Sequence, residues 1–287
     1  MTASLNSIDT LINGFAGEGY VLDRALGTTI FLMFRLAKPL LVEGNAGVGK
    51  TEIAKTLARV LGRELIRLQC YEGLDLSTAV YEWNYQKQLL AIKIQEASGA
   101  SAEQKEKHIF SPEFLLERPL LRSIRAAETP VLLIDEIDRS DEAFEAFLLE
   151  LLSDFQITIP ELGVIRATHR PFVILTSNRT RELSDALKRR CLYHWIDYPD
   201  FEKELAIVRA RLPGVEENLA AQTVNFVQSV RRLDLAKPPG VAETLDCVAA
   251  LCALGRERLD ADAIEAALGA IAKSADDAAL IREKAVS

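Results

Sequence analysis

A short glycine-rich stretch is the feature that most constrains how this chain folds. It fits the pattern G-x-x-x-x-G-K-[ST] and follows the apolar run PLLVE directly. Its glycines let backbone N–H groups turn inward around phosphate oxygens, and the helix expected after it presents its positive end there. In such a loop Lys50 reaches the β- and γ-phosphates and Thr51 ligates Mg²⁺. We therefore predict that a nucleotide is held by Gly44, Asn45, Ala46, Gly47, Val48, Gly49, Lys50, Thr51 and Glu52.

Two carboxylates close a second apolar run, Val131–Ile134. Such a run is typical of a strand buried on both faces, and ligands bind at the carboxyl ends of strands in open α/β sheets. We predict that Asp135 holds Mg²⁺ through the water shell of the ion, and that Glu136 polarises the water that attacks a γ-phosphate. The alternative is a strand that ends in solvated acids, and the phosphate-binding loop upstream counts against it.

Two further polar features have both a functional and a structural interpretation. Asn178 ends the apolar run FVILTSN, where it can orient the attacking water together with Glu136 or cap a helix expected over 181–189. The basic pair Arg189 and Arg190 lies at the end of that expected helix and can complement its dipole. If subunits form a ring, an arginine here can instead enter the neighbouring site and stabilise transition-state charge.

Strand and helix patterns alternate through residues 1–198, which predicts an α/β fold with a mostly parallel sheet. In this part we also expect a helix over Pro112–Ala127 and a hairpin that pairs Phe155–Ile159 with Gly163–Arg166. After Pro199 only alanine-rich helical patterns follow. We therefore predict a nucleotide-binding α/β domain at 1–198 and a smaller all-helical lid domain at 199–287.

Charge and hydropathy exclude several classes of protein. The chain has 34 Lys and Arg against 42 Asp and Glu, a net charge of −8. An acidic chain is poorly suited to sequence-independent binding of phosphate backbones, so we do not expect a nucleic-acid partner. The apolar runs are far shorter than the roughly 20 residues of a membrane span. The first residues, MTASLNSIDTLING, lack the basic and apolar regions of an export signal, so we expect a cytoplasmic protein.

The cysteines do not form a metal-binding pattern. None of them makes a CxxC pair or has a histidine at zinc-finger spacing. The expectation is buried free thiols in a reducing compartment. The four positions are Cys70, Cys191, Cys247 and Cys252.

Taken together, the phosphate-binding loop, the acidic strand end, the Asn-terminated strand, the RRC sequence and the helical tail resemble an AAA+ ATPase over nearly the whole chain. The sequences AIKIQE…FLLERPLL, DEIDR and LAKPPGVAETLD, with the hairpin after LLELL, are similar to the MoxR branch. The segment LIRLQCYEGLDLSTAVYEWNYQKQLL resembles CoxD-like MoxR proteins, which are encoded with molybdenum-containing carbon monoxide dehydrogenases and related molybdenum hydroxylases.

The resemblance implies a hexameric ATPase that uses ATP and Mg²⁺ and acts as a maturation chaperone for the metal centre of a client metalloenzyme. It also implies a possible partner with a von Willebrand factor A domain.

Carried over residue by residue, Gly44, Gly49, Lys50 and Thr51 match the Walker A positions of that family, and Asp135 and Glu136 match Walker B. Asn178 matches sensor 1. Arg190 stands where the trans-acting arginine is expected, with Arg189 as the alternative. The lid departs from the pattern, because Val241 stands near the position of the sensor 2 arginine and Lys237 is the candidate replacement.

An aromatic cluster within the distinctive segment keeps two interpretations. Tyr81, Trp83 and Tyr85 alternate and would share one face of an extended run. They either pack under the edge of the sheet or belong to a loop that contacts a client or lines the ring pore.

Two other functions compete with a remodelling ATPase. A small-molecule kinase shares the phosphate-binding loop, but the paired acids, the Asn-terminated strand and the helical lid suit hydrolysis by water. A DNA-linked AAA+ ATPase shares the RRC sequence, but the acidic charge and the lack of a recognisable DNA-binding module count against it.

Overall fold

The computed structural model describes residues 7–96 and 101–285. They group into two compact units, each built from separate stretches of chain. The first unit comprises the described parts of Met1–Phe31, Glu43–Thr56 and Trp195–Ser287, and the second comprises Leu32–Val42 and Leu57–His194. The predicted domain division after residue 198 stays a prediction.

Among the described residues, a five-stranded sheet forms the centre of the α/β region, in the order β2-β5-β8-β1-β9. The strands are β1 Leu40–Gly44, β2 Leu65–Gln69, β5 Val131–Asp135, β8 Phe172–Ser177 and β9 Leu192–Ile196. β5 pairs in parallel with β2 on one side and with β8 on the other, and all of its residues are buried. The predicted α/β fold with a mostly parallel sheet and a helical C-terminal region is therefore confirmed.

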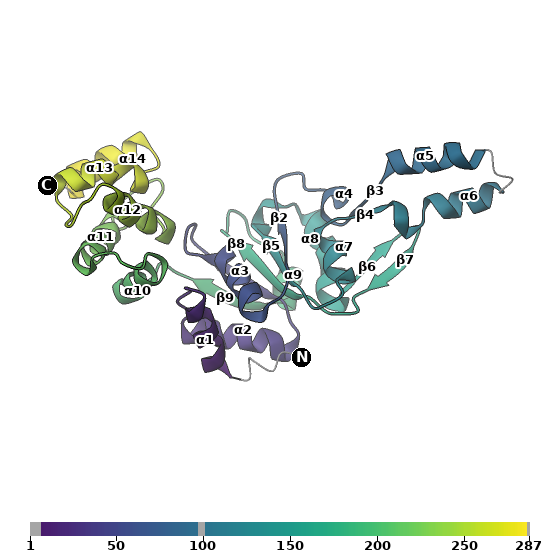
Figure 1. Cartoon of the computed structure of the whole chain (residues 1–287), viewed down its shortest axis with the longest axis horizontal. Helices are drawn as coiled ribbons and strands as arrows, with labels where there is room; N and C mark the ends of the chain where they lie inside the picture. The colour runs from purple at the N-terminus through teal and green to yellow at the C-terminus, as the bar shows by residue number, and fades with distance from the viewer. Residues whose placement is uncertain (1–6, 97–100, 286–287) are drawn as a thin grey trace. The chain divides into compact units, whose positions relative to one another are not determined.

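Helices α7 and α8 pack against the sheet and complete its core (Figure 1). Leu132 and Ile134 of β5 share one hydrophobic cluster with Leu148 and Leu151 of α8. The Asp141 carboxylate accepts a hydrogen bond from the backbone N–H of Phe144 and so caps α8. The helices of this region are α1 Ile8–Gly17, α2 Arg24–Leu36, α3 Lys50–Leu61, α7 Pro119–Arg125, α8 Glu142–Asp154 and α9 Asp185–Arg190.

The segment between β2 and β5 differs most from the expectation. The helix predicted over Pro112–Ala127 is wrong in its first half, where a 3₁₀ turn at Pro112–Phe114 and the strand β4 Leu115–Glu117 precede α7. Proline stands at the first position of both the turn and α7, because a missing N–H costs nothing there. The predicted helix over 181–189 is likewise shorter, since α9 begins only after the cap Ser184.

An insertion that the sequence did not predict lies in the same segment. α4 Leu76–Ala79 leads into the strand β3 Tyr81–Trp83, which pairs antiparallel with β4. Between these strands α5 Tyr85–Glu96 and α6 Ala102–Ile109 lie beside each other as a helical pair (Figure 1).

The aromatic cluster divides between these elements. Tyr81 and Trp83 do share the extended strand β3, where Trp83 is buried and packs edge-on against Phe110. The expectation fails for Tyr85, which begins α5 and is 63% exposed. Core packing therefore accounts for Trp83, whereas Tyr85 contributes to the surface of the insertion.

The hairpin after α8 is confirmed, with β6 Gln156–Ile159 paired antiparallel to β7 Gly163–Arg166.

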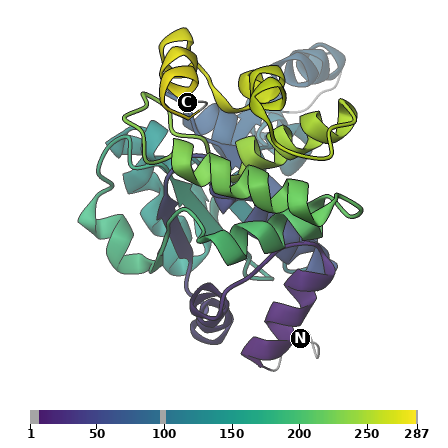
Figure 2. The same cartoon turned by 90° about the vertical axis from the view of Figure 1, so that its left-hand side faces the viewer.

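The C-terminal helices form a bundle with its own core, green to yellow in Figure 2. A buried ion pair joins two of them, because Arg231, after α11, donates to both carboxylate oxygens of Glu204 in α10. The helices are α10 Phe201–Arg211, α11 Glu217–Val230, α12 Val241–Ala253, α13 Ala261–Ile271 and α14 Ala275–Ala285.

Within residues 7–96 and 101–285, no helix is both long enough and apolar enough to cross a membrane.

The four cysteines all lie within the described residues and carry free thiols. Cys70 and Cys247 are buried as expected, Cys191 is partly buried, and Cys252 is exposed, so the expectation of burial is wrong there. Burial raises the pKa of Cys70, Cys191 and Cys247 to about 12, and we call these three the shielded thiols.

Candidate functional site

The glycine-rich loop connects the end of β1 to the start of α3, as the sequence predicts. Gly44 accepts no side chain, because a Cβ there would lie 2.1 Å from the backbone oxygen of Ile196 in β9. The Lys50 ammonium is buried and donates to the carbonyl oxygens of Gly44 at 2.9 Å and Asn45 at 2.6 Å. The loop thus holds its lysine close to its own backbone.

Glu52, in the first turn of α3, engages basic side chains on two helices. Its carboxylate lies 3.4 Å from the Lys55 ammonium and 3.5 Å from the Arg211 guanidinium of α10. The start of α3 is thereby linked to the C-terminal helices.

The start of α12 touches the glycine-rich loop through backbone atoms. The N–H of Val241 donates to the carbonyl of Gly47 at 3.0 Å. A Cβ on Gly240 would lie only 2.8 Å from the Cα of Gly47, so glycine at 240 permits this approach. The Glu243 carboxylate accepts from the Gly240 N–H at 2.9 Å and fixes the same turn. A backbone contact therefore joins the loop and α12 beside the residue that stands near the sensor 2 position.

Lys237, the candidate replacement for that arginine, lies in the exposed segment before α12. Its backbone N–H donates to Asp277, which also accepts from the N–H of Ala236. Arg231 donates to the Pro239 carbonyl at 2.6 Å and so restrains the residue that precedes Gly240.

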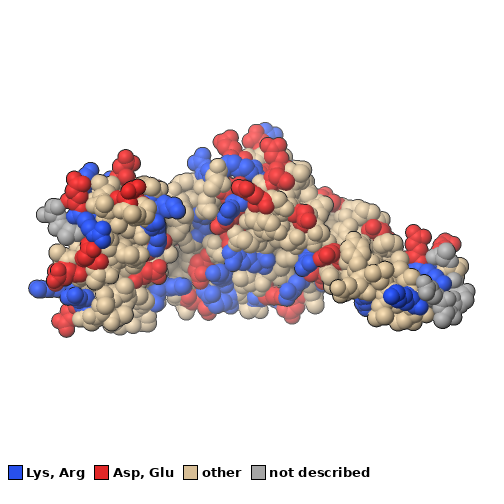
Figure 3. Space-filling view, turned by 90° about the horizontal axis from the view of Figure 1, so that it is seen from above, with Lys and Arg blue, Asp and Glu red and all other residues tan. Residues whose placement is uncertain are grey.

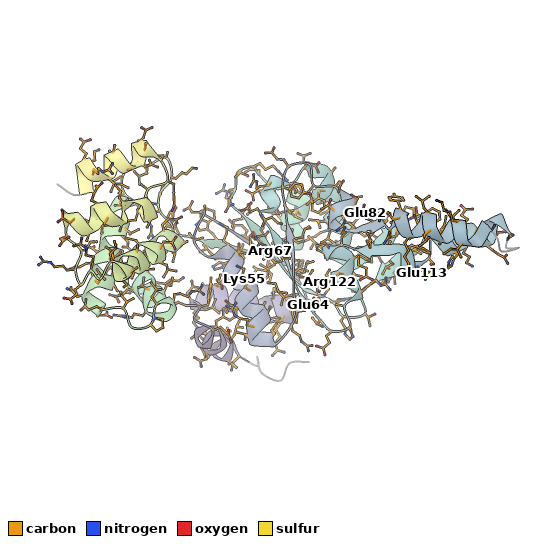
Figure 4. The ribbon with its side chains drawn as sticks, turned by 45° about the horizontal axis from the view of Figure 1, so that its top comes forward. Lys55, Glu64, Arg67, Glu82, Glu113 and Arg122 are labelled. Carbon is orange, nitrogen blue, oxygen red and sulfur yellow. The ribbon has the colours of Figure 1, made fainter. Side chains whose placement is uncertain are left out.

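The carboxyl end of β5 carries the predicted Mg²⁺ ligand. Asp135 is 2% exposed, and its two carboxylate oxygens receive different donors. Thr176 of β8 donates to Oδ1 at 2.5 Å. The Arg67 guanidinium of β2 donates to Oδ2 at 2.6 and 3.1 Å, and Arg67 is labelled in Figure 4. Side chains from the two strands that flank β5 thus fix this carboxylate.

Glu136 follows in a left-handed backbone conformation, with φ 55° and ψ 50°. Few residues other than glycine adopt this conformation. Its backbone N–H donates to the Thr176 hydroxyl at 2.9 Å, and its carboxylate lies 3.3 Å from the Arg139 guanidinium. The left-handed turn sends the chain from β5 into the 3₁₀ turn Ile137–Arg139.

Asp138 connects this turn to the segment after β8. Its carboxylate accepts from the backbone N–H of Asn178 at 3.2 Å and from the N–H and hydroxyl of Thr180. Glu136 and Asn178 consequently line one open pocket of about 580 Å³. The structure thus brings together the two residues predicted to orient the attacking water.

The acidic strand end also affects a neighbouring thiol. Burial is the main cause of the raised pKa of Cys70, and the charges of Asp135, Asp138 and Glu136 raise it further. Cys70 therefore stays protonated near neutral pH and is no candidate nucleophile.

The two candidate arginines differ in their surroundings. Arg190 donates to the Ser153 hydroxyl at 2.5 Å and to the Ala186 carbonyl at 2.9 Å. Arg189 is exposed. Arg190 is thus engaged within its own chain, whereas Arg189 is exposed to solvent.

Comparison with known proteins now identifies the fold. Residues 39–191 match the AAA domain family, dynein-related subfamily. This chain belongs to that family. An uncharacterized protein of Staphylococcus epidermidis is 26% identical over 208 residues, covering 70% of this chain and 71% of that protein. An uncharacterized protein of Staphylococcus aureus is 27% identical with the same coverage.

Among solved structures, a mutant of RuvB from Thermotoga maritima superposes with a TM-score of 0.51 at 18% identity, covering 92% of this chain and 72% of that chain. At this identity the likeness shows the AAA+ fold alone.

Several residues of this AAA domain became apparent only in the structure. The sequence offered only a weak indication for Thr176, because it lies two positions before Asn178 and alternate residues of an extended run share a face. Gly240 had no distinctive signal, since glycine is among the residues commonly found where a helix begins. Arg67 and Asp138 had none, as charged residues near strand ends are common.

Proposed function

We propose that this AAA domain protein is an ATPase that hydrolyses ATP with Mg²⁺. The observation that carries the proposal is the pocket shared by Glu136 and Asn178 at the carboxyl end of the sheet, in a chain with a complete glycine-rich phosphate loop. A carboxylate beside an amide can accept a proton from water and orient it.

The remaining residues have roles that follow from their chemistry. The loop Gly44–Gly49 offers N–H donors to phosphate oxygens, and Lys50 exchanges its carbonyl partners for the β- and γ-phosphates. Mg²⁺ prefers oxygen ligands, and the Thr51 hydroxyl and Asp135 carboxylate are such donors. When bound, the ion would neutralise phosphate charge. Arg67 and Thr176 orient Asp135, and Glu136 takes the proton of the attacking water.

The proposal extends to a homo-oligomeric ring, most simply a hexamer, in which an arginine of one subunit completes the site of the next. Arg190 is the proposed finger and Arg189 the alternative. The exposure of Arg189 supports that alternative, whereas Arg190 must leave Ser153 to reach a neighbour. In the lid, the backbone contact between Gly47 and Val241 supports communication with the nucleotide, and Lys237 remains the proposed source of positive charge.

The most specific part of the proposal concerns the client protein. We propose a MoxR-type chaperone of the CoxD-like branch, acting in the cytoplasm on a client metalloenzyme such as a molybdenum hydroxylase or carbon monoxide dehydrogenase. A partner with a von Willebrand factor A domain is part of the proposal. Its support is the sequence resemblance of the segment from Leu65 to Leu90, which includes the strand β3 and the start of the exposed helix α5.

A DNA-linked function receives less support. The net charge is −8, and acidic and basic side chains are interspersed on the face shown in Figure 3. Proteins that bind phosphate backbones carry clustered lysine and arginine instead. Transfer of phosphate to a small molecule is also less suited to a site with a water-activating carboxylate.

The decisive experiment replaces Glu136 with glutamine, which keeps the shape and cannot act as a base. Hydrolysis should fall about 10²–10⁴-fold, as is typical when general-base catalysis is lost. Nucleotide affinity measured by calorimetry should stay within a few-fold of wild type, because the phosphate loop is unchanged.

The matched control is Glu161→Gln in the exposed turn of the hairpin, which should hydrolyse ATP at the wild-type rate. Hydrolysis at the wild-type rate by Glu136→Gln would place the catalytic carboxylate elsewhere. Glu136→Gln should also trap a client and any partner in a pull-down from the native host. Phosphorylation of a metabolite by wild type, with no protein captured, would favour the kinase alternative.

A further inference from the structure

One hydroxyl group touches both acidic residues at the end of β5. Thr176 is 1% exposed, and its side chain lies between the carboxylate of Asp135 and the backbone N–H of Glu136. The two contacts measure 2.5 and 2.9 Å and bridge 41 and 40 positions of sequence. This arrangement joins the proposed metal ligand to the proposed base.

The direction of these hydrogen bonds is fixed by the chemistry of the groups. A backbone N–H only donates, and an ionised carboxylate only accepts. The Thr176 oxygen must therefore accept from Glu136, and its single proton must point to Asp135. The chain from Glu136 N–H through the hydroxyl to the carboxylate has one polarity, and such a chain strengthens each bond in it.

Glu136 depends on this contact because of its backbone. A non-glycine residue in the left-handed region persists only where its surroundings hold it. The Thr176 hydroxyl satisfies the amide of that residue, while Arg67 holds the other oxygen of Asp135. Arg67 is half exposed, whereas Thr176 is sealed from solvent. Water therefore cannot easily replace the hydroxyl.

We propose that Thr176 is a positioning residue which couples the metal-binding and water-activating positions of this site. It acts through its hydroxyl, by holding the Asp135 carboxylate and the turn at Glu136 in one fixed relation. The inference rests on the proposed ATPase function and names a residue that the sequence motifs do not assign.

The test compares two substitutions that separate the hydroxyl from the shape of the side chain. Thr176→Val keeps the volume and removes the hydroxyl, whereas Thr176→Ser keeps the hydroxyl and removes the methyl group. The first readout is the affinity for a fluorescent ATP analogue, measured in a Mg²⁺ titration and again with EDTA. The second is the steady-state rate of ATP hydrolysis.

We expect Thr176→Val to bind the analogue in EDTA as wild type does. The Mg²⁺ concentration at which half of the change in analogue affinity is reached should rise about 10- to 100-fold, the range expected for a lost hydrogen bond to a charged group. Its kcat should fall by a similar factor. Thr176→Ser should stay within about 3-fold of wild type in both, since its hydroxyl keeps both bonds. The thermal unfolding midpoint establishes that each variant is folded, and Thr176→Cys, a weak donor, replaces the valine variant if that one does not fold.

Three results would overturn the proposal. Unchanged Mg²⁺ dependence in Thr176→Val means that the hydroxyl does not position Asp135. Equal losses in the serine and valine variants mean that packing is responsible. A loss of analogue binding in EDTA means that the effect reaches the phosphate loop. If wild type fails to hydrolyse ATP, the proposed function fails separately, and the Mg²⁺ titration still tests the role of Thr176.

Discussion

A double substitution in the C-terminal helical bundle tests how these helices are held together. Glu204 of α10 is 0% exposed, and the side chain of Arg231 is only 7% exposed. The guanidinium donates to the two carboxylate oxygens at 2.6 and 2.5 Å. Thr244 and Gln228 donate to the same carboxylate at 2.6 and 3.0 Å. The pair thus lies in a satisfied network at the junction of α10, α11 and α12.

Arg231→Met keeps much of the side-chain volume but leaves the Glu204 carboxylate buried without its counter-charge. Breaking a buried ion pair from one side costs about 3–5 kcal/mol. For a cooperative unit of about 60 to 100 residues, each kcal/mol of lost stability lowers the unfolding midpoint by roughly 4–8 °C. We therefore expect the unfolding midpoint of the C-terminal bundle to fall by more than about 10 °C.

Adding Glu204→Leu to this variant should recover stability, because an apolar pair of similar volume is often neutral or better than a buried ion pair. The assay is thermal unfolding followed by circular dichroism, with hydrogen exchange of α10 and α12 to assign the transition to the C-terminal bundle. Arg282→Met is the matched control, since Arg282 makes a bidentate pair with Glu265 on the surface of the same bundle. It should change the midpoint little. Losses that simply add in the double variant, or equal shifts for Arg231→Met and Arg282→Met, would refute the reasoning.

Three further predictions follow from the surroundings of particular side chains. Arg190→Ala should abolish ATP hydrolysis while leaving nucleotide affinity, measured by calorimetry, nearly intact. If Arg190→Ala hydrolyses ATP normally and Arg189→Ala does not, Arg189 is the arginine that completes the neighbouring site. In thiol labelling at pH 8, Cys252 should react rapidly and the three shielded thiols slowly, and rapid labelling that survives Cys252→Ser would contradict this. The raised pKa of the shielded thiols, about 12 against an ordinary 9.0, leaves their contribution to stability intact below pH 9 and removes it as the pH rises toward 12, which unfolding midpoints across that range will measure.

Much of the fold could be predicted because its signals are local. The buried strand Val131–Asp135 is a continuous apolar run, and the hairpin after α8 is a pair of alternating runs around a proline. Helices of the C-terminal bundle carry their own caps, with Asp200 and Asp260 each accepting a hydrogen bond from the backbone N–H three residues on. The phosphate loop is encoded within eight consecutive residues, Gly44–Thr51.

The insertion escaped prediction for a physical reason. β3 and β4 are three residues each, and neither makes a strand without the other. Their pairing brings together residues more than 30 positions apart. The alternation of Tyr81, Trp83 and Tyr85 therefore predicted an extended run correctly for the first two residues, but it could not show that the strand ends before Tyr85. The strand β9 was not predicted for the same reason, because it is a strand by pairing with β1 at the edge of the sheet.

The sequence by itself determined which residues are candidates for binding phosphate and Mg²⁺, since the glycine-rich loop and the acids at the strand end form contiguous motifs. The tertiary structure alone decided what holds them. Arg67 reaches Asp135 across 68 positions, and Thr176 reaches it across 41. Gly240 meets Gly47 across a still longer stretch of chain. These contacts depend on the order of strands and the packing of helices, and a hydrogen bond between distant residues leaves no periodicity or spacing in the sequence from which it could be predicted.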